Sequence, residues 1–446
     1  MRISDLPFFS AFYEDTGRLI MTGVVDIPEE ILLFRDMIHI LDLTGSPIRE
    51  IPEWVVWLWS LSALFLWKTS LTSLPQVLSQ CMRLKILSCK DGNIAWIDED
   101  FSFPPNLEWL ILTNNPKITH LPESIGRLSH LKKLALAGTW LSELPESLKN
   151  CKNLEFLRIS ACQFSSIPHW ISTFSKLAWY ADGGNPCSMK SAPFESDREI
   201  DIADTWEWKM IHKSNISRVS RARLRSSGQD IAIKTFKSSI TSDGYALDDI
   251  GASLTLWKHE NIMSTLGFVR ASPDDIDISL PRLVSLYIPD TYQKIAGPPS
   301  LESCTRDIFH PEKTFTIDYI VHVLSGVLSA CAYIHTRGIS HGDLYAHNIL
   351  VNENWHAILT DFWATTRYEV RTMSSLYEQC DLRAFGHLMR ELLDRVQRYG
   401  EADVRKSTLE SLWQKYFSEE SRESATFQSI VNEFLNWENM MKYWVG

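Results

Sequence analysis

The segment LPESIGRLSHLKKLALAGTWLSE, residues 121–143, is followed directly by LPESLKNCKNLEFLRISACQFSS, residues 144–166. The two 23-residue segments place their leucines and their Leu-Pro pair at corresponding positions. The register extends in both directions, with apolar anchors spaced by 23, 23, 23, 24, 23 and 23 residues: Leu41, Leu64, Leu87, Leu110, Leu134, Leu157 and Tyr180. Self-similarity at a fixed short period predicts a stacked repeat array.

Each repeat reads LxxLxLxxxxLxxLPxxLxxLxx, and a column of prolines supports this register: Pro52, Pro75, Pro122, Pro145 and Pro168. The third repeat lacks the proline and has Ile97-Asp98 instead. The alternating LxL segment predicts a short strand and the LPxxLxxL segment a turn or short helix, so stacked copies bury one leucine core. The pattern resembles the leucine-rich-repeat family over residues 36–186, which implies an α/β solenoid of about seven repeats of 23 residues.

The repeat half also predicts its own borders. We expect residues 1–35 to cap the open end of the core and residues 187–205, rich in Gly, Pro, Ser and acidic residues, to form a linker. The asparagine that usually follows the strand in this family is clear only at Asn114 or Asn115. In the other repeats Thr, Ser, Gly or Cys must satisfy the backbone of the turn.

Large aromatic side chains occupy strand positions that point out of the core, toward the concave face: Phe65, Trp67, Trp109, Phe156 and Trp179. Exposed aromatics on a concave surface favour protein binding, so we expect a protein partner or substrate there. The alternative is that some of these rings pack against the neighbouring domain or are merely tolerated.

The C-terminal half carries ISHGDLYAHNILV at residues 339–351 and TDFW at residues 360–363. Phosphoryl transfer needs a carboxylate that orients the attacking hydroxyl and a metal that neutralises the phosphates. We expect Asp343 to orient the hydroxyl and Asn348 and Asp361 to hold Mg²⁺ through oxygen ligands. Small-molecule phosphotransferases of the aminoglycoside-kinase type use the same spacing, so this motif alone is only moderately specific.

Further segments follow in the order of a protein kinase. IAIK, ending at Lys234, resembles the strand whose lysine grips the ATP phosphates. Apolar spacing predicts a buried helix over residues 317–335. DLRAFG, beginning at Asp381, resembles the start of a hydrophobic helix whose aspartate caps the helix and binds the catalytic-loop backbone. Residues 206–446 are therefore predicted to be an α+β bilobal protein-kinase-like domain that uses ATP and Mg²⁺.

A closer resemblance covers the whole chain. The segment AGPPSLESCTRD at residues 296–307, the run HGDLYAHNIL and the sequence LRAFG are similar to a group of bacterial kinases with N-terminal leucine-rich repeats. The resemblance implies an ATP-dependent protein kinase, with Ser/Thr acceptors favoured over Tyr and a substrate recruited by the repeats.

The pattern departs from protein kinases around the nucleotide. The phosphate-covering loop has no glycine, and Ser214, Ser217 and Val219 stand in the aligned segment. We expect these three residues to line the nucleotide site with Lys234, Asn348 and Asp361, and side chains in the loop to weaken or reshape binding. The glutamate partner expected for Lys234 is not clear from the sequence: Asp248 or Asp249 lies near its place, one or two residues off register and one methylene shorter.

Two substitutions affect the loops that gate the site. Trp363 replaces the glycine of the DFG motif, which should restrict movement of Asp361. Gly342 replaces the arginine that would bind a phosphorylated activation loop. We therefore expect activity that phosphorylation of this loop does not switch; a large gain in rate after phosphorylation at Thr365, Thr366 or Tyr368 would refute this.

Composition sets outer limits. The 446 residues are 45% hydrophobic and 22% charged with a formal net charge of -11, which argues against nucleic acid or an anionic membrane as the main partner. Eight cysteines without a CxxC pair indicate a reducing compartment and no zinc site. We expect a cytoplasmic protein without a membrane span; delivery into a host cell by an unreadable signal stays open, as does the oligomeric state.

Three functions remain after this reading. The first is a protein kinase in which Asp343 and Lys234 are catalytic. The second is a pseudokinase scaffold that has kept the fold with weak or no catalysis. The third is a small-molecule phosphotransferase, against which the DLRAFG helix and the attached repeats count.

Overall fold

The computed structural model describes residues 2–189, 196–214, 216–242, 244–256, 258–270, 280–370, 374–397, 404–417 and 425–442. Contacts divide the chain into two compact units. Unit 1 consists of Met1–Leu177, Gly184–Cys187 and Ile240–Asp243, and unit 2 of Ala178–Gly183, Ser188–Ser239 and Gly244–Gly446. The division differs from the border predicted at residue 186, because residues 178–183 belong by their contacts to unit 2.

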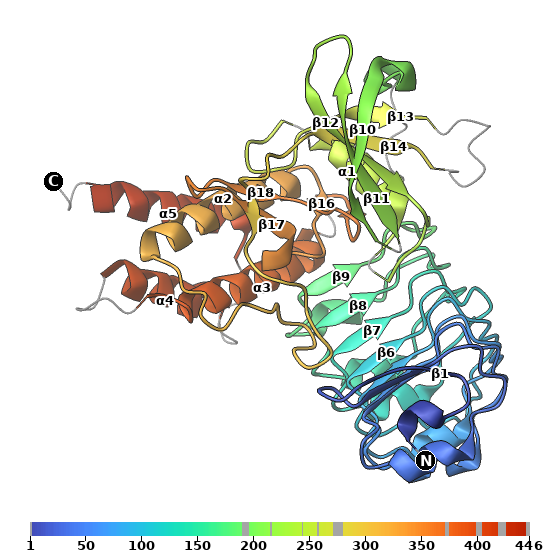
Figure 1. Cartoon of the computed structure of the whole chain (residues 1–446). Coiled ribbons are helices and arrows are strands. Elements are labelled where there is room, and N and C mark those ends of the chain that lie inside the picture. Colours follow the sequence, from blue (N-terminus) through green and yellow to red (C-terminus); the bar gives the residue numbers. More distant parts are fainter. Residues whose placement is uncertain are drawn as a thin grey trace. The chain divides into compact units, whose positions relative to one another are not determined.

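Unit 1 is built on one sheet whose strands follow in sequence order (Figure 1). The strands are β1 Phe9–Tyr13, β2 Arg18–Met21, β3 Ile40–Asp42, β4 Ala63–Phe65, β5 Ile86–Ser88, β6 Trp109–Ile111, β7 Lys133–Ala135 and β8 Phe156–Arg158. The predicted anchors from Leu41 to Leu157 pair in register from β3 to β8, and each is fully buried. Residues 1–35, predicted as a cap, supply the antiparallel pair β1–β2, and β2 continues the sheet in parallel with β3.

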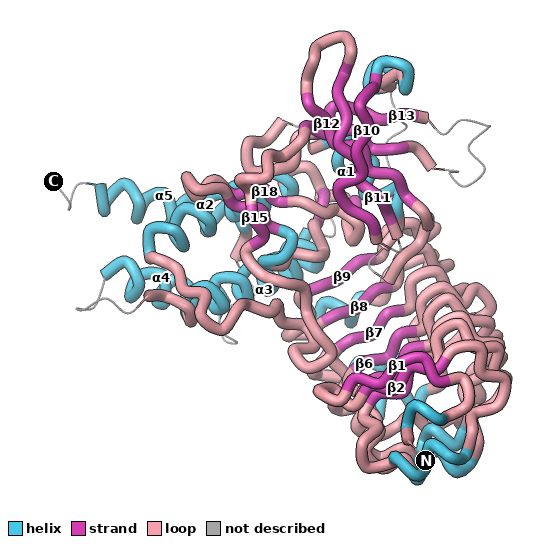
Figure 2. Tube along the Cα trace, in the orientation of Figure 1, coloured by secondary structure: helices cyan, strands magenta, loops and turns pink. Residues whose placement is uncertain are grey.

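The proline column marks the starts of short 3₁₀ helices on the side of the array opposite the strands. Each proline is the residue before one of these helices: Glu53–Trp57, Gln76–Gln80, Glu123–Arg127, Glu146–Asn150 and His169–Thr173. Proline fixes φ near the value that a helical turn needs, so this column sets where each turn begins. The third repeat, without proline, forms no such helix in the part of the chain that the structure describes. Figure 2 shows the resulting alternation of short strands and long loops.

A polar side chain after the strand satisfies the backbone of the turn in most repeats, as predicted, although the third repeat has Gly92 at this position. Asn115 is the family asparagine: its Oδ1 accepts from the Ile94 amide at 3.0 Å, and its Nδ2 donates to the Cys89 and Leu112 carbonyls at 2.8 and 2.9 Å. Asn114 instead adopts a φ of 57°. The smaller residues at the same position bond fewer carbonyls: Ser46, Thr69, Thr139 and Cys162. A second asparagine that the sequence analysis missed, Asn185, repeats the Asn115 pattern on Phe164 and Ile159.

The predicted exposed aromatic face is wrong. Four of the five rings are buried, with 7% of Phe65, 7% of Trp109, 2% of Phe156 and 1% of Trp179 exposed, and Trp67 is half-buried. In unit 1 long cationic side chains of nearby strands lie over the rings: Arg18, two strands away, over Phe65 at 5.7 Å, and Lys133 of the adjacent strand over Trp109 at 4.9 Å and over Phe156 at 4.2 Å. Cation–π attraction and the aliphatic stems of these residues favour covering the rings.

The first part of unit 2 is an antiparallel sheet with a helix. Its strand order is β10-β11-β12-β14-β13. The bounds are β10 Thr205–Lys213, β11 Ser217–Leu224, β12 Asp230–Phe236, α1 Ala246–Thr255, β13 Thr265–Val269 and β14 Arg282–Leu286. The second half of the predicted linker is structured: Ile200 N–H donates to the Phe268 carbonyl at 2.8 Å, and Ile200 packs on the core of the sheet. Residues 190–195 of that prediction lie outside the described residues.

The second part of unit 2 is mainly helical. Its elements are β15 Gln293–Lys294, α2 Ile317–His335, β16 Ile339–Ser340, β17 Ile349–Val351, β18 Ala357–Leu359, β19 Thr366–Arg367, α3 Ser374–Leu393, α4 Val404–Phe417 and α5 Phe427–Lys442. Helix α2 has the predicted bounds and packs against α3, α5 and β18. By length and composition α2 could cross a membrane, but most of it is buried inside unit 2, which is how the core helix of a globular domain behaves. The remaining strand, β9 Trp179–Ala181, has the sequence of a repeat strand.

Replacing Asn115 by alanine removes four hydrogen bonds from a buried turn and leaves the Ile94 amide without its acceptor. We expect the free energy of unfolding, measured by urea denaturation, to fall by about 1–3 kcal/mol. Asn106→Ala is the matched control, because the Asn106 amide makes one exposed bond to the Met82 carbonyl. Its loss should stay within about 0.5 kcal/mol, and equal losses in the two variants would contradict the role of Asn115.

Candidate functional site

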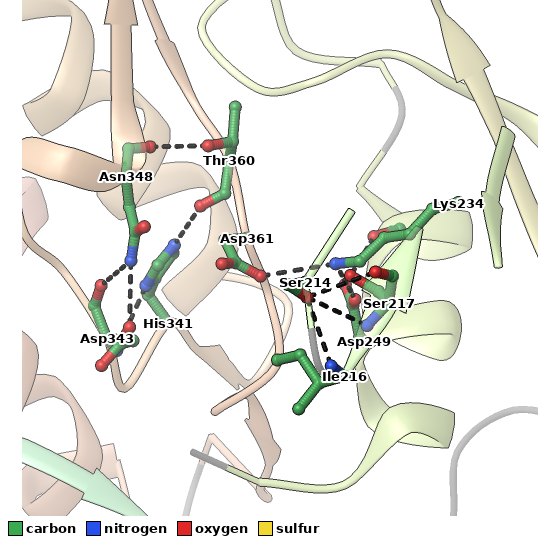
Figure 3. Close-up of polar contacts among 11 residues, drawn as sticks. Ser214, Ile216, Ser217, Lys234, Asp249, His341, Asp343, Asn348, Thr360 and Asp361 are labelled. Carbon is green, nitrogen blue, oxygen red and sulfur yellow. Dashed lines mark hydrogen bonds and ion pairs between the residues drawn. The ribbon is translucent and has the colours of Figure 1, made fainter. Parts of the chain in front are cut away.

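Lys234 stands at the centre of a three-residue ionic cluster between the sheet and the helical part of unit 2. Strand β12 carries Lys234, and its Nζ lies 2.7 Å from Asp249 Oδ2 on α1 and 3.4 Å from Asp361 Oδ1 (Figure 3). Burial alone would lower the pKa of Lys234, but the two carboxylates outweigh it and raise that pKa, so the ammonium stays charged. Of the two aspartates left open by the sequence, Asp249 is the partner of Lys234.

The catalytic-loop residues predicted from the HGD motif lie together. Asn348 Nδ2 donates to the backbone carbonyl and to Oδ2 of Asp343, both at 2.9 Å. His341 is fully buried and braces the loop, as predicted. Its Nδ1 accepts from the Asp343 amide at 3.2 Å, so its Nε2 carries the proton that is donated to the Thr360 carbonyl at 3.1 Å. These bonds tie Asp343 to the residue that precedes Asp361.

Asp381 anchors the catalytic loop from below. Its buried carboxylate accepts from the His341 amide at 2.7 Å, the Gly342 amide at 2.9 Å and His335 Nε2 at 2.9 Å. The predicted backbone contact is therefore confirmed. The predicted helix cap is wrong, because α3 begins at Ser374 and Asp381 lies inside it. The preceding residues SLYEQC contain no glycine or proline, so nothing in them stops the helix from starting earlier.

The glycine-free loop between β10 and β11 closes through a serine side chain. Ser214 Oγ accepts from the amides of Ile216 at 3.2 Å and Ser217 at 3.1 Å. Gly-rich loops hold phosphate with backbone amides of this kind, and in this loop two such amides are bonded to the hydroxyl of Ser214. Val219 lies on β11 opposite Lys234 on β12. The nucleotide contacts of Ser214, Ser217 and Val219 remain predictions.

Trp363 fills the space beside the ionic cluster. It is 3% exposed and packs in one apolar cluster with Phe236 of β12 and Ile250 of α1. Its ring lies edge-on to Phe236 at 5.2 Å, and Lys234 Nζ lies 5.3 Å from the centre of the same ring. Asp361 itself has a φ of 66°, a left-handed conformation that costs a non-glycine residue about 1–3 kcal/mol and is found mainly at functional sites.

Gly342, where a kinase would have arginine, is required by the backbone. Its φ is 69°, and a Cβ would lie 2.4 Å from the Ala364 carbonyl oxygen and 2.7 Å from that of Tyr180. The residues that follow Trp363 pack closely although position 342 carries no arginine: β19 pairs with β16, and Thr365, Thr366 and Tyr368 are 1%, 0% and 4% exposed. Their hydroxyls are therefore shielded from solvent in this conformation.

Sequence reasoning missed several residues that surround the catalytic loop. His347 Nδ1 lies 2.6 Å from Asp307 Oδ1, and the His347 amide donates to Asp307 Oδ2 at 3.0 Å. Burial lowers the pKa of His347, but the hydrogen bond and charge of Asp307 outweigh it and raise that pKa. Tyr345 stacks on Trp179. Asp307 ends the AGPPSLESCTRD segment, so that resemblance was the available signal; for Trp179 the repeat period predicted a different role.

The donor set fits a hard divalent cation. Asn348 uses its amide N–H groups on Asp343, which leaves the amide oxygen as a ligand, and the Asp361 side chain is 43% exposed beside it. Figure 3 places Asp361 between Asn348 and Lys234. Among the described residues no group of three or more His, Cys, Asp or Glu side chains could hold a metal ion, so Mg²⁺ would rely on these two side chains and on the nucleotide.

Comparisons with known proteins agree with this geometry. Residues 209–384 match the family model of the protein kinase domain. The chain is 29% identical over 146 residues to the R436 protein of Acanthamoeba polyphaga mimivirus, described as a serine/threonine-protein kinase, covering 32% of this chain and 49% of that protein. It is 29% identical over 171 residues to CBL-interacting protein kinase 26 of Oryza sativa subsp. japonica, covering 37% of this chain and 31% of that protein. The chain thus spans less than half the length of these curated relatives.

A solved leucine-rich-repeat protein of Leptospira interrogans, LIC12759, is 26% identical and covers 36% of this chain and 41% of its own, with a TM-score of 0.34. The repeat fold of unit 1 is established by the paired strands and leucine core described above.

Gly342 and Gly228 form a matched pair, because both have a φ of 69° but Gly228 has no atom within 4 Å of an added Cβ. Gly228→Ala should lower the free energy of unfolding by about 1–2 kcal/mol through backbone strain alone. Gly342→Ala should lose about 1–3 kcal/mol more, because the new methyl meets two carbonyl oxygens. Urea denaturation measures both, and equal losses would show that the site tolerates a side chain.

Proposed function

We propose that this chain is an active ATP-dependent protein kinase, because residues 209–384 match the family model of the protein kinase domain. One observation carries the proposal: Lys234 is paired with both Asp249 and Asp361 while Asp343 and Asn348 are bonded to each other. These are the groups that phosphoryl transfer requires, and the fold brings all of them together from four separate segments.

The residues divide the work as follows. Lys234, whose pKa is raised, would hold the phosphates of ATP with a fixed positive charge. Asp343 would orient the acceptor hydroxyl and take its proton, and the bond from Asn348 holds the carboxylate in place. Asn348 and Asp361 would hold Mg²⁺, which neutralises phosphate charge when it is bound with the nucleotide. Trp363 shields Lys234 on one side, so water is excluded from part of the ionic cluster.

We propose Ser/Thr acceptors, because both curated relatives that match this part of the chain are kinases and the mimivirus protein is described as a serine/threonine-protein kinase. We also propose that the repeats recruit a protein substrate. The aromatic strand residues are buried, so recruitment must use other surface. Unit 1 exposes 55% of Trp57, 47% of Trp59 and 59% of Met82, which occupy the helix side of the first repeats, and exposed tryptophans are favoured in protein interfaces.

A pseudokinase scaffold is the second candidate, and a specific observation favours it. Ser214 engages the loop amides that would hold phosphate, and Trp363 replaces a glycine whose freedom many kinases use. In this reading the ionic cluster stabilises the fold and the unit serves as a binding module.

Phosphate incorporation separates these functions. We expect the full-length protein with Mg²⁺ and radiolabelled ATP to label a generic Ser/Thr substrate protein, and Asp343→Asn to reduce the rate by at least about 10²-fold because the general base is lost. Nucleotide binding, followed by thermal shift, should persist in that variant. Asp394→Asn, which removes only an exposed pair with Arg390, is the control. Binding of ATP without any transfer in the wild type would support the scaffold, and labelling of small molecules alone would support a small-molecule phosphotransferase.

If unit 1 recruits the substrate, changes on its exposed surface should affect phosphorylation of full-length proteins and not of a short peptide. Trp57→Ser combined with Trp59→Ser should leave phosphorylation of a short generic peptide unchanged and weaken labelling of full-length proteins in a lysate. The control is Trp140→Ser, which removes an equally exposed tryptophan, at 56%, from a later repeat. Equal effects of the two sets of variants on lysate labelling would count against this surface.

A further inference from the structure

Strand β9 has the sequence of a repeat strand, yet residues 178–183 are grouped by contact clustering with unit 2. Residues 178–183 touch the catalytic loop on one side and the segment after Trp363 on the other. Residues 178–183, which have repeat sequence, therefore contact two parts of the site that the proposed function uses: the catalytic loop and the segment after Trp363.

Trp179 holds the catalytic loop next to Asp343. Its Nε1 donates to the Leu344 carbonyl at 3.1 Å, and its ring stacks on Tyr345 with centroids 4.5 Å apart and planes within 1°. His387 of α3 stacks on the same indole at 5.4 Å, and the Arg306 guanidinium lies 5.3 Å from the ring centroid. Trp179 is 1% exposed, so these contacts account for an aromatic residue that faces no solvent.

Asp182 holds the segment after Trp363. Its amide donates to Thr366 Oγ1 at 3.1 Å, next to the pairing of β19 with β16. Its carboxylate accepts from the Tyr180 hydroxyl at 2.7 Å and from the Tyr377 hydroxyl of α3 at 2.8 Å. The side chain is thus tied to α3 while the backbone is tied to β19, which fixes the distance between the two elements.

The close approach of the same strand explains two glycines. The Tyr180 carbonyl oxygen lies where a side chain on Gly342 would stand, and a Cβ on Gly183 would meet Asp248 Oδ2 at 2.2 Å and the Thr365 carbonyl oxygen at 3.0 Å. Glycine at both positions allows backbone to pack on backbone. A phosphorylated residue held by an arginine would serve the same purpose in another kinase. Here the ordering contacts need no modification.

We propose that residues 178–183 are a positioning element of the kinase site. Trp179 fixes the catalytic loop at Asp343, and Asp182 fixes the segment after Trp363, the activation segment, at Thr366. The proposal rests on the proposed kinase function. In this proposal β9 is required for phosphoryl transfer itself, whether or not the repeats recruit a substrate. Phosphorylation of the segment after Trp363 is then unnecessary. Trp179 and Asp182 touch no reacting atom; they act through Leu344, Tyr345 and Thr366.

The test uses full-length variants and two readouts. Trp179→Leu should reduce kcat with a generic peptide at least 10-fold while KM for ATP changes less than 3-fold, because small displacements of catalytic groups are costly and the nucleotide contacts lie elsewhere. Hydrogen exchange should accelerate over residues 342–345. Asp182→Asn should accelerate exchange over residues 364–367 and lower kcat by a smaller factor. Phosphatase treatment of the wild type should leave kcat unchanged.

Controls separate positioning from loss of folding. Phe101→Leu removes part of a fully buried ring in unit 1 and should lower Tm without changing kcat more than 2-fold. If Trp179→Leu does not fold, Trp179→Phe keeps a ring for stacking on Tyr345 and loses only the Nε1–H donor, so an intermediate kcat is expected. Exchange and kcat in Trp179→Leu or Trp179→Phe equal to those of Phe101→Leu would overturn the proposal. If the wild type transfers no phosphate, the proposed function fails, and unchanged exchange at residues 342–345 would still overturn the positioning role.

Discussion

The buried carboxylate of Asp381 is the constraint on which the candidate site depends. A charge with no solvent contact must be satisfied by donors, and here the donors are two successive amides of the catalytic loop and the ring of His335 at the end of α2. The same oxygens therefore join α2, α3 and the HGD loop. Breaking a buried ionic network of this kind by removing one partner costs about 3–5 kcal/mol. His341 is in turn hydrogen-bonded to the Asp343 amide and to the Thr360 carbonyl. Asp381 therefore also helps to fix the loops that contain Asp343 and Asp361.

The departures from a typical kinase pattern form one connected set. Gly342 stands where a kinase has arginine, and its positive φ and the carbonyl oxygens of Ala364 and Tyr180 leave no room for a side chain; Asp182, just after β9, binds Thr366 of the following segment. Trp363 replaces glycine and packs against Phe236 and Ile250, so the helix that carries Asp249 is held by apolar contact as well as by Lys234. At Gly342 and Trp363 the departure from the kinase pattern thus coincides with close packing of the surrounding residues.

Local and periodic signals predicted most of the fold. The repeat spacing predicted the position of every paired leucine from Leu41 to Leu157. It could do so because the conformations of a three-residue strand and of a turn that begins at proline depend on residues close in the sequence. The spacing of apolar residues likewise predicted the bounds of α2, because the buried face of a helix is defined by residues close in the sequence. The choice between Asp248 and Asp249 was different: adjacent helical residues point about 100° apart, and the docking of α1 decides which one meets Lys234. The roles of Trp179 and Ser214 were also beyond reach, since one depends on residues some 165 positions away and the other on how a loop without glycine folds back on its own amides.

Strand β9 also bears on how such a protein could arise by fusion of two genes. A junction placed where the repeat pattern ends, after Tyr180 and its turn, would transfer a catalytic domain that lacks Trp179 and Asp182. If residues 178–183 position the site as proposed, the segment that must be inherited together extends beyond the matched region, 209–384, and includes β9. If one repeat array were replaced by another during evolution, β9 would have to stay with the C-terminal domain. The number of preceding repeats could vary, because each of them pairs only with its neighbours.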